Sequence, residues 1–517
     1  MNTARYSEED ITRFLSEPST HGPEAGEIEL IETHLSNVFL VGEKAFKLKR
    51  RVSLPYVDFS TVEQRKRACE AEVRLNSRTA PQFYKGVIPV NRKPDGTLEL
   101  GGTGEVVDWV VETARFDQDQ LFDRMALRGE LDRQEMEDLA GIIDHFHESA
   151  ETIPVLSGSQ LIADLIEGNV DCLSSYGAGV LDKVKTEELT RLSKRALQKL
   201  TPLLDQRASE GKVRHCHGDL HLRNIFQHQG QPVIFDCIEF NDDIAICDII
   251  YDLAFLLMDL DHRGLRRLAS IAMNSYLDRS GDAESLALLP LFLSIRAAIR
   301  AHVYALQAHS LHDPVQAAER GREAASYLEL ALGYLAPVKP RLLAVGGLSG
   351  SGKSRLAREV ACVIDPAPGA RVVRTDIVRK RLNKVPFSDS LGAEGYTPEM
   401  TEKTYQAFRA ELEASIKAGH SAIADAVFAK QQQREQVAEL AASLDVALEG
   451  LWVDVSLEIR EQRVSSRERN VSDVTVEIAR QQMDYDLGEI SWLRIDSSGP
   501  REATMDQAYK ALKIRSD

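Results

Sequence analysis

The feature that most restricts the fold of this chain is an eight-residue segment, Gly-Leu-Ser-Gly-Ser-Gly-Lys-Ser, at positions 347–354. It fits the pattern GxxxxGK[ST], follows a short apolar run at 342–345, and leads into an amphipathic run that begins at Ser354. The order of strand, glycine-rich loop and helix is the context in which this pattern binds phosphate. A Gly/Ser-rich surface turn could match the same letters, but the flanking segments argue against that alternative.

The residue types in this loop fit the chemistry of a nucleotide site. Glycines allow a tight turn that points backbone N–H groups inward, and the helix N-terminus adds a partial positive charge. A lysine at the end of the loop is expected to reach the β- and γ-phosphates of ATP, and the hydroxyl that follows it to complete the shell of a magnesium ion. The predicted nucleotide-binding residues are Gly347, Gly350, Ser351, Gly352, Lys353 and Ser354, with Ser354 also a metal ligand.

A second phosphoryl-transfer signature lies upstream, where His-Gly-Asp-Leu-His-Leu-Arg-Asn at 217–224 is followed by Val-Ile-Phe-Asp at 233–236. The spacing HxDLxxxN with a second Asp is that of a kinase catalytic loop. We expect Asp219 to orient an acceptor hydroxyl and take its proton, and Asn224 and Asp236 to hold Mg²⁺. Each residue alone has an ordinary alternative, such as a helix cap for Asp219, but the joint spacing favours catalysis. A polar turn between the two parts predicts a hairpin.

These segments carry a resemblance to known families. Residues from about 30 to 335 resemble the aminoglycoside phosphotransferase-like family of small-molecule kinases, and those from about 341 onward resemble P-loop kinases of the zeta-toxin and gluconate-kinase type. The resemblance implies an α/β and α+β chain with a two-lobed, protein-kinase-like domain at 1–335 and a P-loop NTPase domain with a parallel sheet at 341–517. A proline-containing linker at 334–341 would join them. Such folds accept many substrates, so the resemblance does not identify an acceptor.

The resemblance also suggests how the first domain holds nucleotide. A hairpin at 38–48 would carry Lys47 as the lysine on the α- and β-phosphates, and a helix at 65–75 would carry Glu72 as its ion-pair partner. A charged strand edge and a solvated helix face would produce the same letters. No GxGxxG loop precedes the strand, which argues against a protein kinase. The alternates for the lysine and its partner are Lys49 and Glu70.

Other segments of the first domain are expected to support this site. Residues 106–114 could form the connection between lobes, whose backbone would hold adenine. Asp248 and Asp252 lie four apart on one predicted helix, and Arg296 and Arg300 repeat that spacing on a later helix. Buried carboxylates need partners, so we interpret these groups as structural ion pairs behind the active site and not as a second metal site.

Beyond residue 341, strands and helices alternate, which predicts a parallel sheet with helices on both faces. Asp376 ends one strand and Arg379 follows one turn later, and the resemblance makes them candidates for binding and activating the acceptor. Asp425 ends another strand and is the preferred magnesium ligand, with Asp454 as its competitor. A carboxylate at a strand end is often only the cap of the next helix.

Arg463 and Arg467 lie four apart on a predicted helix downstream. In kinases with a lid, such arginines swing onto the transferring phosphate and neutralise developing charge. An arginine pair on a helix more usually lies on a solvent-exposed face. The phosphate-binding loop earlier in the chain is the reason to consider a catalytic role as well.

Composition limits the partners. The chain has 517 residues, enough for roughly two to four domains. It carries 80 Asp and Glu against 63 Lys and Arg, a net charge of −17, which disfavours nucleic acid and anionic membranes as partners and tolerates a cationic small molecule. Six cysteines without CxxC spacing indicate reduced thiols in the cytoplasm, and no signal peptide is expected. The apolar stretch at 286–299, interrupted by Pro290 and Arg296, predicts a buried helix.

Together these patterns predict a cytoplasmic phosphotransferase with two modules that use ATP and Mg²⁺ and act on hydroxyl groups of small molecules. Three alternatives stay open. The P-loop module could be an ATP-driven regulator of the first, it could be a zeta-like kinase of a nucleotide sugar, or the chain could be a nucleotide sensor without turnover. The sequence gives no indication of oligomeric state.

Overall fold

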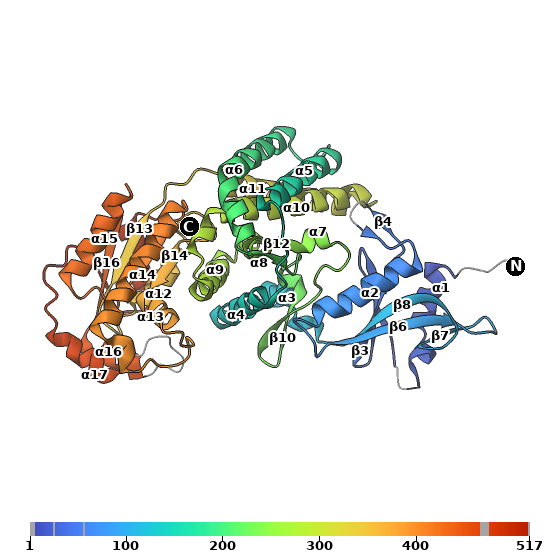
Figure 1. Ribbon diagram of the computed structural model, residues 1–517, viewed down its shortest axis with the longest axis horizontal. Helices are drawn as coiled ribbons and strands as arrows, with labels where there is room; N and C mark the ends of the chain where they lie inside the picture. Colours follow the sequence, from blue (N-terminus) through green and yellow to red (C-terminus); the bar gives the residue numbers. More distant parts are fainter. Residues whose placement is uncertain (1–5, 24–25, 55–56, 466–474, 515–517) are drawn as a thin grey trace. The chain divides into compact units, whose positions relative to one another are not determined.

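The computed structural model describes residues 6–23, 26–54, 57–465 and 475–514 (Figure 1). The chain divides into two compact units. The first unit comprises Met1–Gly158 and Asp205–Leu256, and the second comprises Ser159–Leu204 and Leu257–Asp517. The predicted division into domains at 1–335 and 341–517 is a division by sequence resemblance, and it stays a prediction.

The first unit contains a six-stranded antiparallel sheet in the order β1-β2-β3-β8-β6-β7 (Figure 1). The predicted hairpin at 38–48 is formed by β2 and β3, whose turn contains Gly42 at φ +54°. The strands are β1 (Glu29–Glu32), β2 (Ser36–Val41), β3 (Lys44–Lys49), β6 (Tyr84–Arg92), β7 (Leu98–Leu100) and β8 (Glu105–Ala114).

One helix packs on each face of this sheet. Neighbouring residues of a strand point to opposite faces, and accordingly Val110 packs with Ile11 of α1 (Glu8–Ser16), whereas Val111 packs with Cys69 of α2 (Val62–Asn76). Thr61 caps α2 in a capping box. The predicted helix at 65–75 is therefore confirmed, and it extends beyond both predicted ends.

The prediction that residues 106–114 connect the two lobes is wrong. They form most of β8, which pairs with β3 on one side and β6 on the other. The mostly apolar run around Trp109 lacks alternation, which is typical of a strand with both faces covered. The connection to the rest of the first unit therefore begins after Ala114.

The remainder of the first unit is built around a small hairpin. Its strands pair from Ile225↔Ile234 to His228↔Gln231, and Gln229 and Gly230 both have positive φ in the turn, as a tight hairpin requires. The elements in this part are α3 (Phe122–Arg128), α4 (Arg133–Ser149), β9 (Val213–His215), β10 (Ile225–His228), β11 (Gln231–Ile234), α7 (Asp242–Ala245) and β12 (Ile246–Asp248).

The second unit contains a helical part and a parallel sheet. Its helical part includes α5 (Gly158–Tyr176), α9 (Arg266–Ser280), α10 (Leu289–Ser310) and α11 (Pro314–Tyr334), while α6 (Lys183–Ser209) and α8 (Ile249–His262) contain the boundaries between the units. Among the described helices, α10 is the one long and apolar enough to cross a membrane, and 67% of its apolar window is buried inside the protein. The predicted buried helix is confirmed, but Pro290 lies in its first turn and does not interrupt it.

The parallel sheet has five strands in the order β14-β15-β13-β16-β17 (Figure 1). Helices α12 (Lys353–Ala361) and α18 (Arg501–Leu512) bury apolar residues on one face, and α14 (Pro398–Lys417) and α15 (Gln431–Ser443) on the other. This confirms the predicted architecture. The strands are β13 (Leu342–Gly346), β14 (Arg371–Arg374), β15 (Ala422–Asp425), β16 (Leu448–Asp454) and β17 (Leu493–Asp496).

Helix α9 covers the outer edge of this sheet. The side-chain amide of Asn274 donates to the carbonyl of Ala370 at 3.1 Å and accepts from the backbone N–H of Val372 at 2.7 Å. Beside it, the buried Arg371 lies 2.7 Å from Asp278. Strand β14 therefore pairs with β15 on one side. On the other side, the Asn274 side chain makes the backbone hydrogen bonds that a neighbouring strand would make.

Candidate active sites

The first unit contains a cavity of about 490 Å³ between the antiparallel sheet, α2 and the β10–β11 hairpin. All five residues that the sequence predicts for this site line it. They come from segments as far as 189 residues apart in the chain. These residues are Lys47, Glu72, Asp219, Asn224 and Asp236.

Lys47 bridges two carboxylates in this cavity. Its Nζ lies 3.0 Å from Oε1 of Glu72 and 2.6 Å from Oδ1 of Asp236. Burial works against the charge of Lys47, but Asp236 and Glu72 outweigh burial and raise the pKa of Lys47 well above its ordinary value. The alternate partner Glu70 is exposed and lies 3.7 Å from Lys66 instead. The structure thus brings the predicted lysine and glutamate together and leaves the alternate glutamate outside the cavity.

Asp219 and Asn224 are joined within the loop that precedes the hairpin. The Asn224 amide donates to Oδ2 of Asp219 and to the backbone carbonyl of Asp219, both at 2.9 Å. The Asp219 side chain keeps 37% of its surface exposed, so an acceptor can reach it. Asp236 follows β11 in the left-handed region at φ +62°, which is uncommon for a residue with a side chain and is found where a site fixes the backbone.

Asp252 of α8 holds this loop from behind. Its Oδ1 accepts from the backbone N–H of Gly218 at 2.8 Å, and its Oδ2 accepts from the N–H of His217 and lies 3.1 Å from Nε2 of His147. The ring of His217 in turn lies 2.8 Å from the carbonyl of Phe235, which ties the two parts of the signature together.

The predicted structural role of Asp248 and Asp252 agrees with these contacts, although their partners could not be predicted from spacing. Asp248 receives two hydrogen bonds from Arg207, at 2.7 and 2.9 Å, and Asp252 pairs with His147. Arg300 lies over aromatic rings. Donor atoms of His147, Cys216 and Asp252 lie within 4.8 Å of one another. A metal ion there would displace the backbone hydrogen bonds of Asp252, so we assign these residues to loop support.

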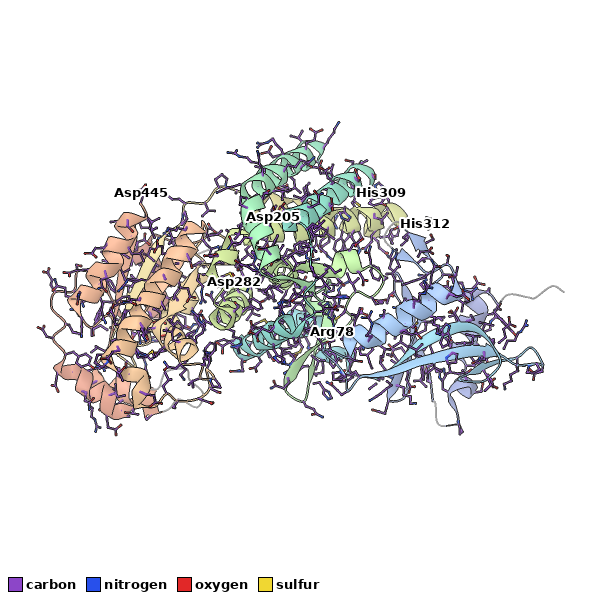
Figure 2. All side chains as sticks on the ribbon, viewed as in Figure 1. Arg78, Asp205, Asp282, His309, His312 and Asp445 are labelled. Atoms are coloured by element: carbon purple, nitrogen blue, oxygen red, sulfur yellow. The ribbon has the colours of Figure 1, made fainter. Side chains whose placement is uncertain are left out.

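Arg78 supports the strand that enters the loop (Figure 2). Its guanidinium donates to the carbonyl of His215 at 2.8 Å and lies 5.0 Å from the ring centre of Phe146. The sequence offered no signal for this residue, because its partners are backbone carbonyl oxygens 137 residues away.

In the second unit, the glycines of the phosphate-binding loop occupy positions that exclude side chains. Gly347, Gly350 and Gly352 have φ of +150°, +85° and +95°. A Cβ on Gly347 would lie 2.6 Å from the carbonyl oxygen of Val453, and one on Gly350 would lie 2.8 Å from that of Arg460. The loop leads directly into α12, whose first two residues are the predicted Lys353 and Ser354.

Asp425 ends β15 beside this loop, in register with Val345. It is 2% exposed, and neither carboxylate oxygen has a hydrogen-bond partner among the described residues. The nearest cation is Arg374, at 3.7 Å. A buried carboxylate is stable only beside a cation or hydrogen-bond donors, so this side chain fits a magnesium ligand. Its competitor Asp454 is half-exposed and lies 2.7 Å from Arg494.

The predicted acceptor residues lie on α13 (Thr375–Leu382), which follows β14 directly. Asp376 is in its first turn, and Arg379 follows one turn later as predicted. The buried guanidinium of Arg379 donates to the carbonyl of Gly395 at 2.8 Å and lies 4.9 Å from the ring centre of Tyr396. Their roles toward an acceptor stay predictions.

Arg463 lies on α16 (Leu457–Ser465) and contacts the phosphate-binding loop from outside. It donates to the carbonyl of Ser351 at 3.2 Å and to the carbonyl of Ser497 at 2.6 Å. The structure therefore places Arg463 on the loop backbone, and its role toward phosphate stays a prediction. Arg467 lies outside the described residues.

Two further residues hold the same loop and were missed by the sequence reasoning. The buried Arg460 donates from Nε to the carbonyl of Ser349 at 2.8 Å. The Gln482 amide accepts from the N–H of Ser349 at 2.8 Å and donates to its hydroxyl at 2.9 Å. The three-residue spacing of Arg460 and Arg463 on one helix could have identified the arginine, whereas Gln482 has no local signal.

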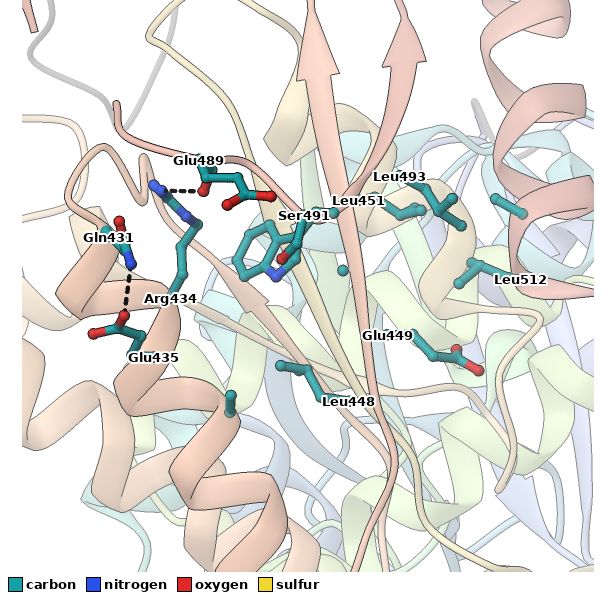
Figure 3. Close-up of a pocket in the computed structure, with 14 residues that line it drawn as sticks. Gln431, Arg434, Glu435, Leu448, Glu449, Leu451, Glu489, Ser491, Leu493 and Leu512 are labelled. Carbon is teal, nitrogen blue, oxygen red and sulfur yellow. Dashed lines mark hydrogen bonds between the residues drawn. The ribbon is translucent and has the colours of Figure 1, made fainter. Parts of the chain in front are cut away.

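The second unit contains a pocket of about 630 Å³ between α15, the first half of β16 and the segment that enters β17 (Figure 3). The buried Arg434 donates there to the carbonyl of Glu489, and Gln431 donates to Glu435 (Figure 3). Arg434 also donates to the carbonyl of Leu487. None of the residues predicted for the nucleotide site lines this pocket.

Two family models match separate segments of the chain. The family model for the phosphotransferase enzyme family matches residues 163–289, and a model for an AAA domain matches residues 342–486. Among solved structures, a choline/ethanolamine kinase family protein from Mesorhizobium loti aligns at 12% identity and TM-score 0.39 over 63% of this chain and 98% of its own. A gluconokinase from Sinorhizobium meliloti aligns at 18% identity and TM-score 0.24 over 34% and 94%. Both TM-scores are too low to carry an argument.

Proteins from two mycobacteria align with this chain over most of its length. Uncharacterized proteins of Mycobacterium tuberculosis and Mycobacterium bovis are each 31% identical over 497 residues, which are 93% of this chain and 95% of theirs. The two family matches confirm the predicted resemblance to phosphotransferases and P-loop kinases. The chain thus belongs to the family of these mycobacterial proteins, and it joins a phosphotransferase-family domain to a P-loop domain of the AAA type.

Proposed function

We propose that this protein is an ATP- and Mg²⁺-dependent phosphotransferase with two modules, each of which transfers the γ-phosphoryl group of ATP to a hydroxyl of a small molecule. The observation that carries the proposal is the cavity of the first unit. In it, Lys47 lies between Glu72 and Asp236, and Asp219 and Asn224 line the same cavity. These are the group types that phosphoryl transfer needs.

Each residue of the cavity has a chemical task in this proposal. Lys47 binds the α- and β-phosphates while Glu72 holds its Nζ in place. Asp236 and Asn224 would hold magnesium, which when bound neutralises charge on the phosphates. Asp219 accepts the proton of the acceptor hydroxyl as the new bond to phosphorus forms. Because Lys47 contacts Asp236 in this structure, nucleotide binding requires that Lys47 exchange this carboxylate for phosphate.

In the P-loop module, different residues carry out the same tasks. The backbone N–H groups of the loop and the N-terminus of α12 bind phosphate, and Lys353 neutralises its charge. Ser354 and Asp425, whose carboxylate oxygens accept no hydrogen bond from the described residues, would hold magnesium. Asp376 and Arg379 are the proposed acceptor residues, and Arg463 and Arg467 the proposed cations near the transferring phosphate.

A second candidate function is supported by helix α9. Residues 266–280 fall within the phosphotransferase-family match, yet they hold β14 of the P-loop sheet through Asn274. This contact favours the alternative in which the P-loop module is an ATP-driven regulator of the first module. The acidic charge supports a cytoplasmic enzyme of small molecules that does not act on nucleic acids or membranes.

The proposal is tested on the full-length chain by ADP release with a panel of sugars and amino alcohols. Asp219→Asn should lower kcat of the first module by about 10²–10⁴-fold with nearly unchanged ATP affinity, because a general base acts in the transition state. The exposed Asp243→Asn is the control for a lost carboxylate nearby. In a chain that also carries Lys353→Ala, so that only the first module is read, retained turnover in Asp219→Asn contradicts the assignment. A parent chain that releases no ADP with any acceptor supports the sensor alternative.

The independence of the two modules is tested by titrating the full-length chain with MgATP. The variant Lys353→Ala should reduce two binding sites to one, because each site has its own lysine and its own metal ligands. Loss of both sites in this variant would show one composite nucleotide site and would overturn the two-module proposal.

A further inference from the structure

A second lysine lies beside Lys47 and is buried more deeply. Lys49 follows two residues later on β3, so its side chain points to the same face of the sheet. It is 1% exposed. Its Nζ lies 2.5 Å from Oε2 of Glu72 and also contacts a carboxylate oxygen of Glu239.

Together these side chains form a continuous row of alternating charges. In order, it runs Asp236, Lys47, Glu72, Lys49, Glu239. Lys47 uses one carboxylate oxygen of Glu72 and Lys49 uses the other. The row contains two cations and three carboxylates, so its net charge is −1 when all five groups are ionised.

Lys49 supplies the second positive charge that stabilises the three carboxylates of this row. Burial raises the pKa of Glu239 above its ordinary value, so this carboxylate depends on an adjacent cation to stay ionised. Burial alone would also raise the pKa of Glu72, yet Lys47 and Lys49 lower it to about 2. Without Lys49, Lys47 would be the one cation of the row among three carboxylates. It would then be attracted to Glu239 as well as to Glu72 and Asp236.

The far end of the row also bears on Asp236. Glu239 comes three residues after Asp236, and the intervening backbone is held by hydrogen bonds from the N–H of Cys237 to Asn76, at 2.8 Å, and from the N–H of Ile238 to His217, at 3.0 Å. The ion pair of Lys49 with Glu239 fixes the end of this segment to β3. The left-handed backbone of Asp236 is therefore enclosed by contacts on both sides.

We propose that Lys49 is a positioning residue of the first active site: it holds Glu72 and Glu239, so that Lys47 is free to exchange Asp236 for nucleotide phosphate and Asp236 is free to bind magnesium. This inference rests on the proposed function of the cavity. It gives the two neighbouring lysines different tasks, since Lys47 contacts nucleotide and Lys49 does not.

The test measures MgATP binding by calorimetry in full-length chains that also carry Lys353→Ala, so that only the first site is read. Lys49→Met should weaken MgATP binding by about tenfold or more and raise the Mg²⁺ concentration needed for half-maximal binding, because the remaining cation is shared among three carboxylates. Lys44→Met is the matched control, since Lys44 begins the same strand, is exposed and pairs with Glu112 at 2.6 Å.

The decisive variant is the pair Lys49→Met with Glu239→Gln. It restores the net charge of −1 with one cation and two carboxylates, and we expect it to recover about half or more of the lost binding free energy. A loss in Lys49→Met that the pair does not recover overturns the proposal, as does unchanged MgATP and Mg²⁺ dependence in Lys49→Met. If circular dichroism shows that Lys49→Met alone does not fold, MgATP binding by Glu239→Gln tests the proposal instead. The proposal expects MgATP affinity within about threefold of the parent, because the contact of Lys49 with Glu72 remains.

A kinetic comparison separates this proposal from the proposed function itself. Lys47→Met should lower kcat and ATP affinity together, and Lys49→Met should act mainly on the KM for ATP. An equal loss of kcat in Lys49→Met would make Lys49 a nucleotide-contacting residue and overturn its positioning role. If the parent chain binds MgATP but releases no ADP with any acceptor, phosphotransfer fails as a function while the binding measurements still decide the role of Lys49.

Discussion

Two buried carboxylates in the second unit show how differently single acidic residues can be used. Glu411 on α14 lies 2.5 Å from Arg371 and 2.5 Å from Arg381, and both arginines outweigh burial and lower its pKa. Asp425 has no hydrogen-bond partner among the described residues and one cation at 3.7 Å. The first carboxylate supports the fold, whereas the second is available to a ligand.

This difference predicts opposite effects of neutralisation. Glu411→Gln should lower the free energy of unfolding by about 3 kcal/mol, because it removes the carboxylate that Arg371 and Arg381 share and leaves Asp278 as the one carboxylate beside Arg371. Asp425→Asn should change it by about 1 kcal/mol or less while removing Mg²⁺-dependent turnover by the P-loop module. Urea unfolding without metal measures both. A loss for Asp425→Asn as large as that for Glu411→Gln would show that Asp425 is structural.

His420 provides a prediction about pH. Its Nε2 donates to the carbonyl of Gly369 at 2.7 Å, its Nδ1 has no partner among the described residues, and burial lowers its pKa to about 4. The unfolded chain, with an ordinary pKa, binds the proton first as pH falls. The stability due to neutral His420 is therefore full above about pH 6.5 and is lost between about pH 6.5 and 4.

When the pH falls from 7 to 5, protonation of His420 in the unfolded chain should lower the free energy of unfolding by about 2 kcal/mol. His420→Gln keeps a donor for Gly369 and cannot be protonated, so its stability should decline less over the same range. Urea unfolding at the two pH values compares the variant with the parent protein. Equal declines would mean that His420 does not titrate in this range.

The limits of sequence reasoning are clearest for individual residues. Asp219, Asn224 and Asp236 could be predicted because the chemistry fixes their spacing within about 20 residues of chain. The contact of Lys49 with Glu239 joins residues 190 apart, and nothing in either local sequence indicates it. Arg460 and Gln482 were missed for the same reason, because their partners are atoms of the phosphate-binding loop more than a hundred residues earlier.

Helix α16 and the turn after α17 (Val476–Gln481) act as a brace for the phosphate-binding loop. Arg460 Nε and the Gln482 amide both bind Ser349, and Arg460 also donates to the carbonyl of Ala479 at 2.7 Å. These contacts leave the N–H groups that follow Ser349 in the loop oriented for phosphate. The brace is thus part of the nucleotide site although it needs no contact with nucleotide.

Removing the brace should weaken nucleotide binding. Arg460→Met should lower ATP affinity of the P-loop module by about tenfold and the free energy of unfolding by about 2–4 kcal/mol, because two buried carbonyl groups lose their donor. Arg480→Met is the control, since Arg480 is exposed and pairs only with Glu461 among the described residues. Calorimetry and urea unfolding give the two quantities, and unchanged ATP affinity in Arg460→Met would contradict the role of the brace.

The predictions about helices and strands succeeded where one pattern dominated. The parallel sheet was recognised from the alternation of strands and helices, the loop-to-helix step from its motif, and helix α2 from a helix-like run of residues. The segment 106–114 was misinterpreted because a strand covered on both faces lacks the alternation that distinguishes a strand from a connection. Pro290 was read as an interruption, although proline is well tolerated in the first turn of a helix.

At the scale of the whole molecule, the bounds of the two compact units differ from the bounds of the two family matches. The second unit combines the P-loop sheet with helices that precede the predicted linker at 334–341. Arg267 of α9 makes two hydrogen bonds to Glu359 of α12, at 3.0 and 2.9 Å, and Arg371 of β14 lies 2.7 Å from Asp278 of α9. Sequence resemblance could not show this, because each family pattern describes its own segment.

This arrangement predicts that residues 341–517 are insufficient as an independent protein. A fragment of these residues should be less stable than the fragment 257–517 by about 3–5 kcal/mol, because the buried Arg371 loses Asp278 and the backbone of β14 loses Asn274. Urea unfolding and analytical ultracentrifugation of both fragments test this. A stable monomer of 341–517 would support the boundary that the sequence predicts and contradict this expectation.

The side chain of Asn274 has a wider consequence. A bare sheet edge is a template on which a second copy of the same strand can add, and proteins escape such aggregation by covering the edge. Here the cover is encoded about 100 residues upstream of the strand that it protects, inside the segment that matches a different family. During synthesis the helix segment leaves the ribosome before the strand, so the residues that cover the edge are already present when the strand emerges. A gene for the P-loop sheet alone would have to evolve another protection.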